Sequence, residues 1–471
     1  MSQVRVLSPR PLMRGSSVGR ATSMYRPAFL CFLYKRQARI EKIGYFVPFF
    51  RSLRNSKQGN LSTDFEFIVL ASYFYGGEKM SDLKIFAKTV DEKAKAQIYA
   101  LIAQPAFADC KVRIMPDVHA GAGCVIGFTA DLGDKVIPNI VGVDIGCGML
   151  TVELGKVDVD FDKLDKVIRE NVPSGMNVND TPNNPFVLAE LKCFKSLRNT
   201  DWIERSIGTL GGGNHFIEID TDDNGNKYLV IHTGSRNLGK QVCEIYQDIA
   251  VYNLHGNGAR KQEVDKLIAE YKTSGRQGEI ADGIAEIKKK FGGAIPKDLC
   301  YLEGKERQDY LHDMGYCQYF AIMNRQEIAN TIMRKMGWTG LGFETIHNYI
   351  DRESNIVRKG AISAKKGESV LIPINMRDGC IIGVGKGNED WNCSAPHGAG
   401  RIMSRMQAKE TLKLDDYRKT MNGIYTTSVC SDTIDEAPQA YKPMQEIVDC
   451  ISDTVAIEKI IKPIYNFKAK E

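Results

Sequence analysis

A carboxylate and a thiol stand three residues apart in the stretch 141–149, which reads Val-Gly-Val-Asp-Ile-Gly-Cys-Gly-Met. The acid is Asp144, the thiol is Cys147, and the glycines around them let the backbone turn tightly. A carboxylate oxygen and a thiolate sulfur form a mixed ligand pair, which Zn²⁺, Mn²⁺ or Fe²⁺ could accept if imidazoles complete the set. If only this pair is considered, a structural turn with a buried thiol is the simpler interpretation, because free cysteines often pack as small apolar residues.

The histidines change this balance. Five of the 7 histidines stand in loops that carry Gly or Asn, most of them directly after an expected strand: His119, His215, His232, His347 and His397. Proteins of the α/β class commonly place ligand-binding groups in such loops. We therefore expect four or five of these histidines to converge on the loop of Asp144 and Cys147. His255 and His312 lack such a setting, and we expect both to be structural or solvent-facing.

The candidate ligands outnumber what one catalytic metal ion takes from a protein, which is about three with one position left open. They are Asp144, Cys147, His215, His232 and His347. Two ions that share the Cys147 thiolate would use all five, and such a pair can clamp the attacking and leaving oxygens of a phosphoryl displacement. A single Zn²⁺ with two of the histidines outside its ligand set is the alternative, and spacing favours neither.

His397 has a different setting from the other histidines. It precedes Gly398 and Gly400, and we expect it at the N-terminus of a helix that includes Ile402, Met403, Met406 and Leu412. There, phosphate oxygens could approach backbone amides and the positive end of the helix dipole, and the same field would keep the imidazole neutral and nucleophilic. Arg401, one turn later, would be available for phosphate. His397 is thus a candidate for covalent nucleotidyl transfer, and a capping role at a tight turn is the alternative.

Apolar patterning predicts the elements that must position these residues. We expect helices at 91–102, in the second half of 152–167, within a Gly-broken surface excursion at 256–300, and at 307–336. The last is amphipathic, with candidate core positions Leu311, Met314, Ile322, Ile328 and Ile332. We expect strands at 110–115 before a loop at 116–123, at 137–143, at the start of 152–167, after His215, and at 228–231. The predicted class is mixed α/β (α+β).

Composition limits the possible settings. The chain has 471 residues. Single cores stop growing at about 300 residues, so one elaborate domain or two ordinary ones are possible. The 12 cysteines show no paired spacing, and we recognise no signal peptide. We also find no apolar run as long as the about 20 residues of a membrane-spanning helix. We therefore expect a reducing, cytoplasmic setting.

Residues 1–79 differ from the rest of the chain. They hold 13 of the 63 Lys and Arg residues but 4 of the 58 Asp and Glu residues, so the remainder is slightly acidic despite a net charge of +5. A nucleic-acid partner must therefore be argued from local chemistry rather than bulk charge. The codons of residues 76–79 would resemble a bacterial ribosome-binding site, so we expect translation to start at Met80. A basic, partly disordered RNA-binding or targeting arm is the alternative.

With these residues assembled, the chain from Met80 to its end resembles the RtcB family of RNA-splicing ligases. The resemblance rests on segments in the family's order and spacing: 116–119 (Pro-Asp-Val-His), 141–149, 213–218 (Gly-Asn-His-Phe-Ile-Glu), 232–236 (His-Thr-Gly-Ser-Arg), 347–348 (His-Asn) and 397–401 (His-Gly-Ala-Gly-Arg). It implies the family's mixed α/β fold over residues 80–471, with a central catalytic cleft built from strand-end loops.

The resemblance also implies an activity. The enzyme would use GTP and Mn²⁺ to join an RNA end that bears a 3′-phosphate or 2′,3′-cyclic phosphate to a 5′-hydroxyl end, in RNA repair or tRNA splicing. His397 would attack the α-phosphate of GTP and become guanylylated. Asp144, Cys147 and His215 would hold one Mn²⁺, and Cys147, His232 and His347 the other. Asp117 would lie near the reacting RNA ends.

The residues implied to contact the nucleotide are Asn214, His215, Phe216, Ile217, Glu218, His347, Asn348, Pro373, Ile374, Asn375, Met376, Cys380, His397, Gly398, Ala399, Gly400 and Lys468. One stretch departs from the family, which often has a Gly-Ser pair before the Met and a Ser four positions later. Here Ile374 and Asn375 precede Met376, and Cys380 follows, so part of the pocket differs.

Two other functions compete with ligation. A metal-dependent phosphodiesterase or 3′-phosphate-capping enzyme would need the metal ligands but not His397. A noncatalytic RNA-binding protein would need neither, and the presence of every candidate ligand and of the nucleophile weighs against it.

Overall fold

Alternating apolar residues build the largest sheet. In the computed structural model, which describes residues 81–121, 123–183, 185–290 and 295–469, seven described strands pair in the order β11-β12-β14-β5-β6-β4-β7. Every neighbouring pair is antiparallel. In chain order the strands are β4 (Gly148–Gly155), β5 (Phe216–Thr221), β6 (Lys227–Thr233), β7 (Leu341–Ile346), β11 (Ser369–Asn375), β12 (Gly379–Gly385) and β14 (Val455–Lys468).

This sheet curls so that its two edges approach each other. The amide of Leu371 in β11 donates to Thr345 Oγ1 in β7 at 3.3 Å. Side chains from all seven strands meet on the enclosed face, in a cluster made of Met149, Phe216, Tyr228, Val230, Phe343, Leu371, Cys380, Ile382 and Ile461. Successive residues of a strand face opposite sides of a sheet, so β5 directs Phe216 inward and Ile217 outward.

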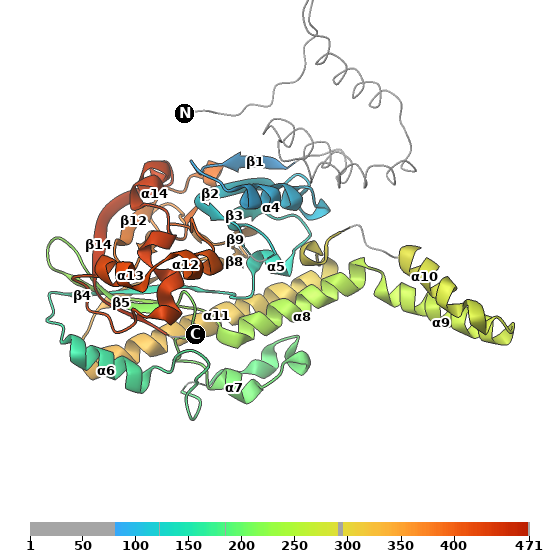
Figure 1. Ribbon diagram of the computed structural model, residues 1–471, viewed down its shortest axis with the longest axis horizontal. Coiled ribbons are helices and arrows are strands. Elements are labelled where there is room, and N and C mark those ends of the chain that lie inside the picture. The colour runs from blue at the N-terminus through green and yellow to red at the C-terminus, as the bar shows by residue number, and fades with distance from the viewer. Residues whose placement is uncertain (1–80, 122, 184, 291–294, 470–471) are drawn as a thin grey trace, which may run out of the picture. The chain divides into compact units, whose positions relative to one another are not determined.

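Helices cover the outer face. Apolar residues of α6 (Phe161–Asn171) and α11 (Gly304–Met336) pack there against β4, β5, β6 and β14. In α11, Met314, Ile328 and Ile332 are buried as predicted, whereas Leu311 and Ile322 are only partly buried. The long helix α8 (Arg236–Leu254) lies beside α11 (Figure 1).

A second sheet carries two of the predicted site residues, Asp117 and Asn348. Its order is β1-β2-β3-β9-β8, with β1 and β2 parallel and the other pairs antiparallel. The strands are β1 (Asp82–Ile85), β2 (Lys111–His119), β3 (Ile126–Asp131), β8 (Asn348–Asp351) and β9 (Ile356–Lys359), and a separate pair joins β10 (Ala361–Ser363) to β13 (Ser394–Pro396). Strand β2 runs to His119, so the loop predicted at 116–123 is wrong in its first half. Its pairing with β3 is irregular between Ile114 and His119, where Pro116 cannot donate to the ladder.

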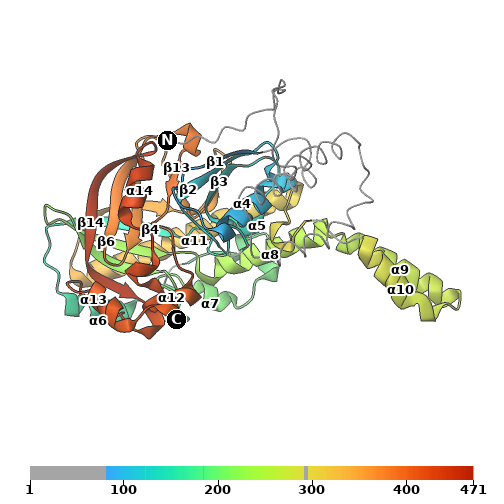
Figure 2. The ribbon, with the colours of Figure 1, turned by 45° about the horizontal axis from the view of Figure 1, so that its top comes forward.

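The remaining α-helices that the structure describes lie between these strands along the chain. They are α4 (Glu92–Ile102), α5 (Pro138–Val141), α7 (Thr200–Glu204), α9 (Asn257–Thr273), α10 (Ile280–Lys290), α12 (Arg405–Thr411), α13 (Leu414–Thr420) and α14 (Met444–Ile451). Helices α9 and α10 form a hairpin that extends away from the sheets in both views (Figures 1 and 2). Both helices fall within residues 256–300, where the sequence analysis expects an excursion, and 291–294 of that range lie outside the described residues, as do the predicted N-terminal extension 1–79 and Met80.

The strand predicted at 137–143 is wrong, because the segment forms the one-turn helix α5. Pro138 occupies the first helical position, where its fixed φ and missing N–H are tolerated, and Gly142, with a φ of 92°, ends the turn. Ile140 and Val141 are buried as a strand there would have been, and periodicity alone does not distinguish the two in so short a segment. The predicted mixed α/β class itself is confirmed.

Candidate active site

The loop that carries Asp144 and Cys147 connects α5 to β4, and a residue distant in sequence holds it in a turn. The amide of Gly146, whose φ is 71°, donates to the carbonyl oxygen of Asn348 at 2.8 Å. The side-chain amide of Asn348 donates in turn to the carbonyl oxygen of Asp144 at 3.2 Å. The left-handed backbone at Gly146 favours glycine, so this loop depends on that residue type.

Two histidines on adjacent strands direct the same ring nitrogen at Cys147. His215 immediately precedes β5, and His232 lies near the end of β6. Their Nε2 atoms are 3.5 and 3.3 Å from Cys147 Sγ, and His215 Nε2 is also 3.1 Å from Asp144 Oδ2. The Nδ1 atom of each ring faces a backbone carbonyl oxygen, at 2.9 and 3.2 Å, of Leu210 and Asn214 respectively. An Nδ1–H that donates to a carbonyl leaves the Nε2 lone pair free, as in metal-ligating histidines.

His347 and His397 extend this row of rings. The ring centres of His232 and His347 are 5.2 Å apart, and those of His347 and His397 are 4.9 Å apart. His347 lies between β7 and β8, and its amide donates to the carbonyl oxygen of Cys147 at 2.9 Å. Its Nδ1 atom is buried and has no hydrogen-bond partner within the described residues. A buried imidazole nitrogen without a protein partner is available to a metal ion.

Two groups of candidate ligands share the Cys147 thiol, and each could hold a metal ion. The ligand atoms of Asp144, Cys147 and His215 lie within 4.8 Å of one another, and so do those of Cys147, His232 and His347. The structure thus brings together the five predicted ligands, in the two sets that the resemblance implied. Their role as ligands remains a prediction.

Burial governs the charge of these side chains. It is the main reason why the pKa values of His232 and His347 lie well below the usual range, so both rings are neutral at pH 7. Burial also raises the pKa of the Cys147 thiol well above its usual value, and the Asp144 carboxylate adds to this effect. For Asp144, burial opposes ionisation, but the interactions of its carboxylate with His215, Cys147 and His232 outweigh it and lower the pKa to about 2. A thiolate at Cys147 therefore requires a further positive charge, which a metal ion would provide.

The Asp117 carboxylate binds His397 at two points. Asp117 Oδ2 accepts a hydrogen bond from His397 Nδ1 at 2.6 Å and from the backbone N–H of the same residue at 3.0 Å. Asp117 is fully buried in β2, whereas the His397 side chain is 19% exposed. Because Nδ1 is the donor, the lone pair of the ring resides on Nε2. Asp117 therefore holds His397 in the tautomer and orientation that a nucleophile needs.

The helix predicted to begin at His397 is wrong. His397 follows β13, and α12 begins only at Arg405, where the Ser404 side chain accepts from the amide of Gln407. Gly400, with a φ of 75°, turns the chain in between. Ile402 and Met406, both expected in that helix, are exposed. Dipole effects fall off within the first turn, so the terminus of α12 lies too far away to act on His397.

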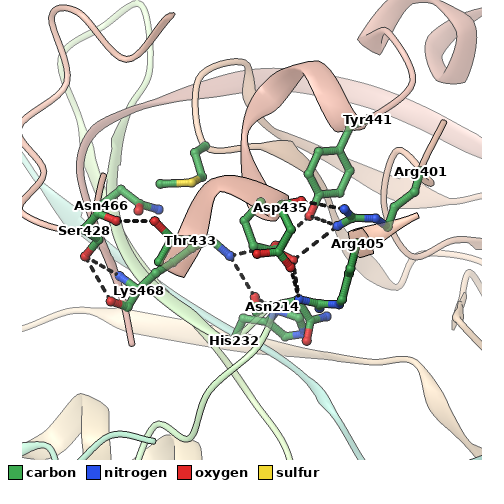
Figure 3. Close-up of polar contacts among 12 residues, drawn as sticks. Asn214, His232, Arg401, Arg405, Ser428, Thr433, Asp435, Tyr441, Asn466 and Lys468 are labelled. Atoms are coloured by element: carbon green, nitrogen blue, oxygen red, sulfur yellow. Dashed lines mark hydrogen bonds and ion pairs between the residues drawn. The ribbon is translucent and has the colours of Figure 1, made fainter. Parts of the chain in front are cut away.

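The prediction that Arg401 is available for phosphate is wrong, because protein partners occupy its guanidinium (Figure 3). Arg401 Nη1 lies 3.2 Å from Glu436 Oε1, and Nε donates to the carbonyl oxygen of Met403 at 3.0 Å. Glu436 ends a short 3₁₀ helix, η8 (Ser431–Glu436), and is 3% exposed. It also contacts Arg405 at 2.9 Å, Lys468 at 3.1 Å and the Tyr441 hydroxyl at 2.6 Å.

Glu436 remains a carboxylate despite its burial. Burial opposes ionisation, but the charges of Lys468, Arg405 and Arg401 outweigh it and lower the pKa of Glu436 to about 2. Lys468 Nζ also donates to the carbonyl oxygen of Asn214 at 3.2 Å, the same oxygen that faces His232 Nδ1 (Figure 3). An ion network thus connects Arg401 to the backbone beside a predicted metal ligand.

The other residues implied to contact nucleotide on β5 lie on both of its faces. Phe216 packs edge-on to His232, and its ring centre is 5.5 Å from Lys468 Nζ. Ile217 packs on the outer face, so only its backbone can face the site. Glu218 is buried, and its Oε1 accepts a hydrogen bond from Asn466.

Residues that depart from the resembled family serve local structure. Ile374 packs with Ala399 in an apolar cluster against α14. Asn375 Oδ1 accepts from two backbone amides in the turn between β11 and β12, and Met376 Sδ lies 3.1 Å from the Tyr417 hydroxyl. Cys380 is fully buried within the curled sheet. A Cβ added to Gly398 would lie 3.2 Å from the Pro373 carbonyl oxygen, so the end of β11 adjoins the His397 loop.

Sequence reasoning missed Arg325, a fully buried residue of α11. Its Nη1 donates to the carbonyl oxygens of Gly146 at 3.0 Å and Thr233 at 2.8 Å, and its Nε pairs with Glu344 at 2.6 Å. Arg325 therefore ties the Cys147 loop to the end of β6 that carries His232. A signal was present, because Arg325 stands three residues before Ile328 on the predicted core face, where a charged residue is unusual.

Two histidines lie apart from this cluster, where the sequence analysis expected them. His255 follows α8, and its Nε2 contacts the carbonyl oxygen of Ile295 at 3.0 Å. His312 stacks on Tyr316 of α11. Among the residues that the structure describes, no helix combines the length and apolar character of a membrane span.

Comparisons with known proteins identify similar chains. The model of a family described as "tRNA-splicing ligase RtcB" matches residues 97–192 and 187–469. A protein of Escherichia coli K12 named "RNA-splicing ligase RtcB" is 28% identical over 418 residues, covering 80% of this chain and 94% of its own. A protein of Archaeoglobus fulgidus named "tRNA-splicing ligase RtcB" is 28% identical over 475 residues, covering 81% and 90%.

Proposed function

This chain belongs to the RtcB family, and we propose that it is an RNA ligase which uses GTP and Mn²⁺ to join RNA ends in RNA repair or tRNA splicing. The substrates are an RNA with a 3′-phosphate or 2′,3′-cyclic phosphate and an RNA with a 5′-hydroxyl. The observation that supports this most directly is the position of His397, whose Nδ1 is held by Asp117 while its ring lies 4.9 Å from that of His347. Residues 80–471 carry the activity in this proposal.

The five candidate ligands suit a metal pair. Asp144, Cys147 and His215 would hold one Mn²⁺, and Cys147, His232 and His347 the other. The fit rests on the neutral rings, on Nε2 atoms directed at Cys147, and on the buried Nδ1 of His347 without a partner among the described residues. When bound, the ions would neutralise charge on phosphate oxygens as a bond is made and broken.

His397 acts first as a nucleophile. Its Nε2 lone pair forms a bond to the α-phosphorus of GTP, and the bond to the bridging oxygen breaks as pyrophosphate leaves. Asp117 accepts the hydrogen bond from Nδ1–H and so stabilises the positive charge that develops on the ring. Asp117 is therefore a positioning residue in this step.

The RNA ends then react in turn. An oxygen of the RNA 3′-phosphate bonds to the phosphorus held by His397, and the P–N bond breaks. The 5′-hydroxyl next attacks the 3′-phosphate phosphorus, GMP leaves, and the hydroxyl proton passes to solvent. A 2′,3′-cyclic phosphate is first opened by water at the same site, which breaks one of its ring P–O bonds.

The nucleotide would lie between the end of β11, the His397 loop and the start of β5. The proposed contacts are residues 214–218, His347, Asn348, residues 373–376, Cys380, residues 397–400 and Lys468. Lys468 would meet phosphate as a cation fixed in place by Glu436. Side chains of Ile217 and Ile374 pack elsewhere, so their part in this pocket would be limited to the backbone.

Labelling with α-³²P GTP tests the proposal. Wild-type protein, His397→Ala and His255→Ala are incubated with Mn²⁺ and separated by denaturing electrophoresis, and the label is then treated with acid. We expect acid-labile label on the wild type and on His255→Ala, which removes a histidine remote from the cluster, and none on His397→Ala. Ligation of RNA with the stated ends should follow the same pattern.

Absence of label on the wild type with both GTP and ATP would overturn the ligase proposal. If that protein still opened 2′,3′-cyclic phosphates in the presence of Mn²⁺, the result would favour a phosphodiesterase. Label from ATP alone would keep the histidine chemistry and replace GTP as the substrate.

A further inference from the structure

A third group of possible ligands lies inside the curled sheet. Glu218 and Asp220 alternate along β5 and share its inner face, and Cys380 reaches the same region from β12. Their carboxylate oxygens and sulfur lie within 4.8 Å of one another, and all three residues are buried. The ligase proposal leaves Asp220 without a role.

The Asp220 carboxylate lacks the hydrogen bonds that a buried charge needs. The residue is fully buried, and neither Oδ1 nor Oδ2 has a hydrogen-bond partner among the described residues. Its surroundings are the apolar cluster of the sheet interior, including Tyr228, Ile382 and Ile461. Burying an unpaired carboxylate is strongly unfavourable, so the group must either take up a proton or face a bound cation.

This cluster is separate from the predicted metal pair. Asp220 follows His215 by five positions along an extended strand. A strand rises by about 3.3 Å per residue, so the two residues are about 16 Å apart along it. An ion beside Asp220 could not share a ligand with the pair around Cys147. The same strand would therefore contact two metal centres, one at its start and one in the sheet interior.

We propose that Glu218, Asp220 and Cys380 bind one divalent cation of the Zn²⁺ class. Two carboxylate oxygens and a thiolate form a borderline donor set that suits Zn²⁺ better than Mg²⁺ or Ca²⁺, whose ligands are oxygens. The cation neutralises both carboxylates, and it fixes Glu218, which Asn466 holds from its other side. The ion acts in structure, because it holds Glu218, one of the proposed nucleotide contacts, from the side of the sheet interior.

Ion counting tests this proposal. Metal-stripped full-length protein is incubated with Zn²⁺, freed of excess by gel filtration, and its zinc measured by mass spectrometry. Relative to the wild type, Asp220→Asn and Cys380→Ser should each lose about one ion per chain, because three ligands are needed to hold it. The controls Asp223→Asn, an exposed acid in the adjacent turn, and Cys450→Ser should retain the full number.

Thermal unfolding supplies a second measurement. Zn²⁺ should raise the Tm of metal-stripped wild type by more than that of Asp220→Asn, because an ion that binds only the folded state stabilises it. Equal zinc content and an equal rise in Tm for wild type and both variants would overturn the proposal and indicate a proton shared by Glu218 and Asp220. If either variant fails to fold, wild-type crystals soaked in Zn²⁺ decide, since no anomalous peak between the three side chains would also overturn it. Neither readout requires ligation, so failure here leaves the ligase proposal intact.

Discussion

Two buried polar clusters share the curled sheet, and they differ in how the protein supports them. At one end of the sheet, carbonyl oxygens of Leu210 and Asn214 fix the Nδ1 atoms of His215 and His232. In the interior, the Asp220 carboxylate has no hydrogen-bond partner within the described residues and has apolar side chains around it. The first cluster is oriented before any ion arrives, whereas the second depends on an ion or a proton to balance its charge.

This difference separates a site built for chemistry from one built for stability. Ligands held by the protein keep their geometry when an ion is lost, which suits a centre where phosphate groups bind and leave. A carboxylate without other partners stabilises the fold only while its cation is present. Four changes would break or sharpen this contrast.

The largest effect is expected from Cys147→Ser. The thiol belongs to both candidate groups, so its loss should weaken the binding of both ions. Ligation should fall by more than about 100-fold. Changing only a residue that hydrogen-bonds to a metal ligand already costs up to about 100-fold, and this substitution changes a ligand itself. The Tm of metal-free protein should change little, because the replacement is nearly isosteric. Ligation assays and zinc or manganese counts measure both effects, with Cys450→Ser as the matched control. Full ion content together with full activity would contradict the assignment.

A smaller effect is expected from Asp117→Asn. The amide can donate to His397 Nδ1, which would move the ring proton to Nε2 and block the nucleophile. Guanylylation should slow by about 10²- to 10⁴-fold, the range of general-base and tautomer effects. Single-turnover labelling with GTP measures the rate. Ion content should equal that of the wild type, because Asp117 acts through a hydrogen bond; a joint loss of ions would make it part of the metal centre instead.

A still smaller effect, measured on stability, is expected from Glu436→Gln. The folded-state pKa of Glu436 is about 2. This lies below the unfolded value of about 4.3, so ionisation stabilises the folded state above the unfolded pKa and ceases to do so as pH falls towards the folded one. The Tm difference between wild type and variant should therefore be largest near neutral pH and shrink between about pH 5 and about pH 2.

In contrast to Glu436→Gln, Asp220→Asn in the metal-free protein should leave the Tm unchanged at neutral pH. Burial raises the pKa of Asp220 well above its usual range, so without a cation the native side chain is already neutral at pH 7 and Asn resembles it. Its Tm should match that of metal-free wild type at neutral pH.

A Tm difference for Glu436→Gln that stays constant with pH would show that hydrogen bonding, rather than charge, sets the contribution of Glu436.

The site residues that could be predicted from the sequence lie in short contiguous motifs. Asp144 and Cys147 share one loop, and His215 and His232 adjoin strands whose alternation is clear, so local patterns located the residues that later converge. The long helix α11 was equally predictable from its period, including buried Met314 and Ile328.

Features that depend on tertiary structure were not predictable in this way. The Asp117–His397 pair joins residues 280 positions apart. The segment after His397 has apolar residues at helical spacing, yet it follows a strand and turns at Gly400 before α12 begins. The partners of Arg325 were not predictable for a related reason, since they include backbone carbonyls of Gly146 and Thr233, which leave no mark in a sequence.

Strand β5 carries a constraint on length that differs from any constraint on residue type. Its inner face presents Phe216, Glu218 and Asp220, and its outer face presents Ile217 and Ile219 to the helices. An insertion or deletion of one residue within the strand would exchange the two faces at once. The isoleucines would then enter the sheet interior and the carboxylates would meet apolar helix surfaces. Natural variants should therefore differ from this chain in β5 by substitution and not by a change in its number of residues.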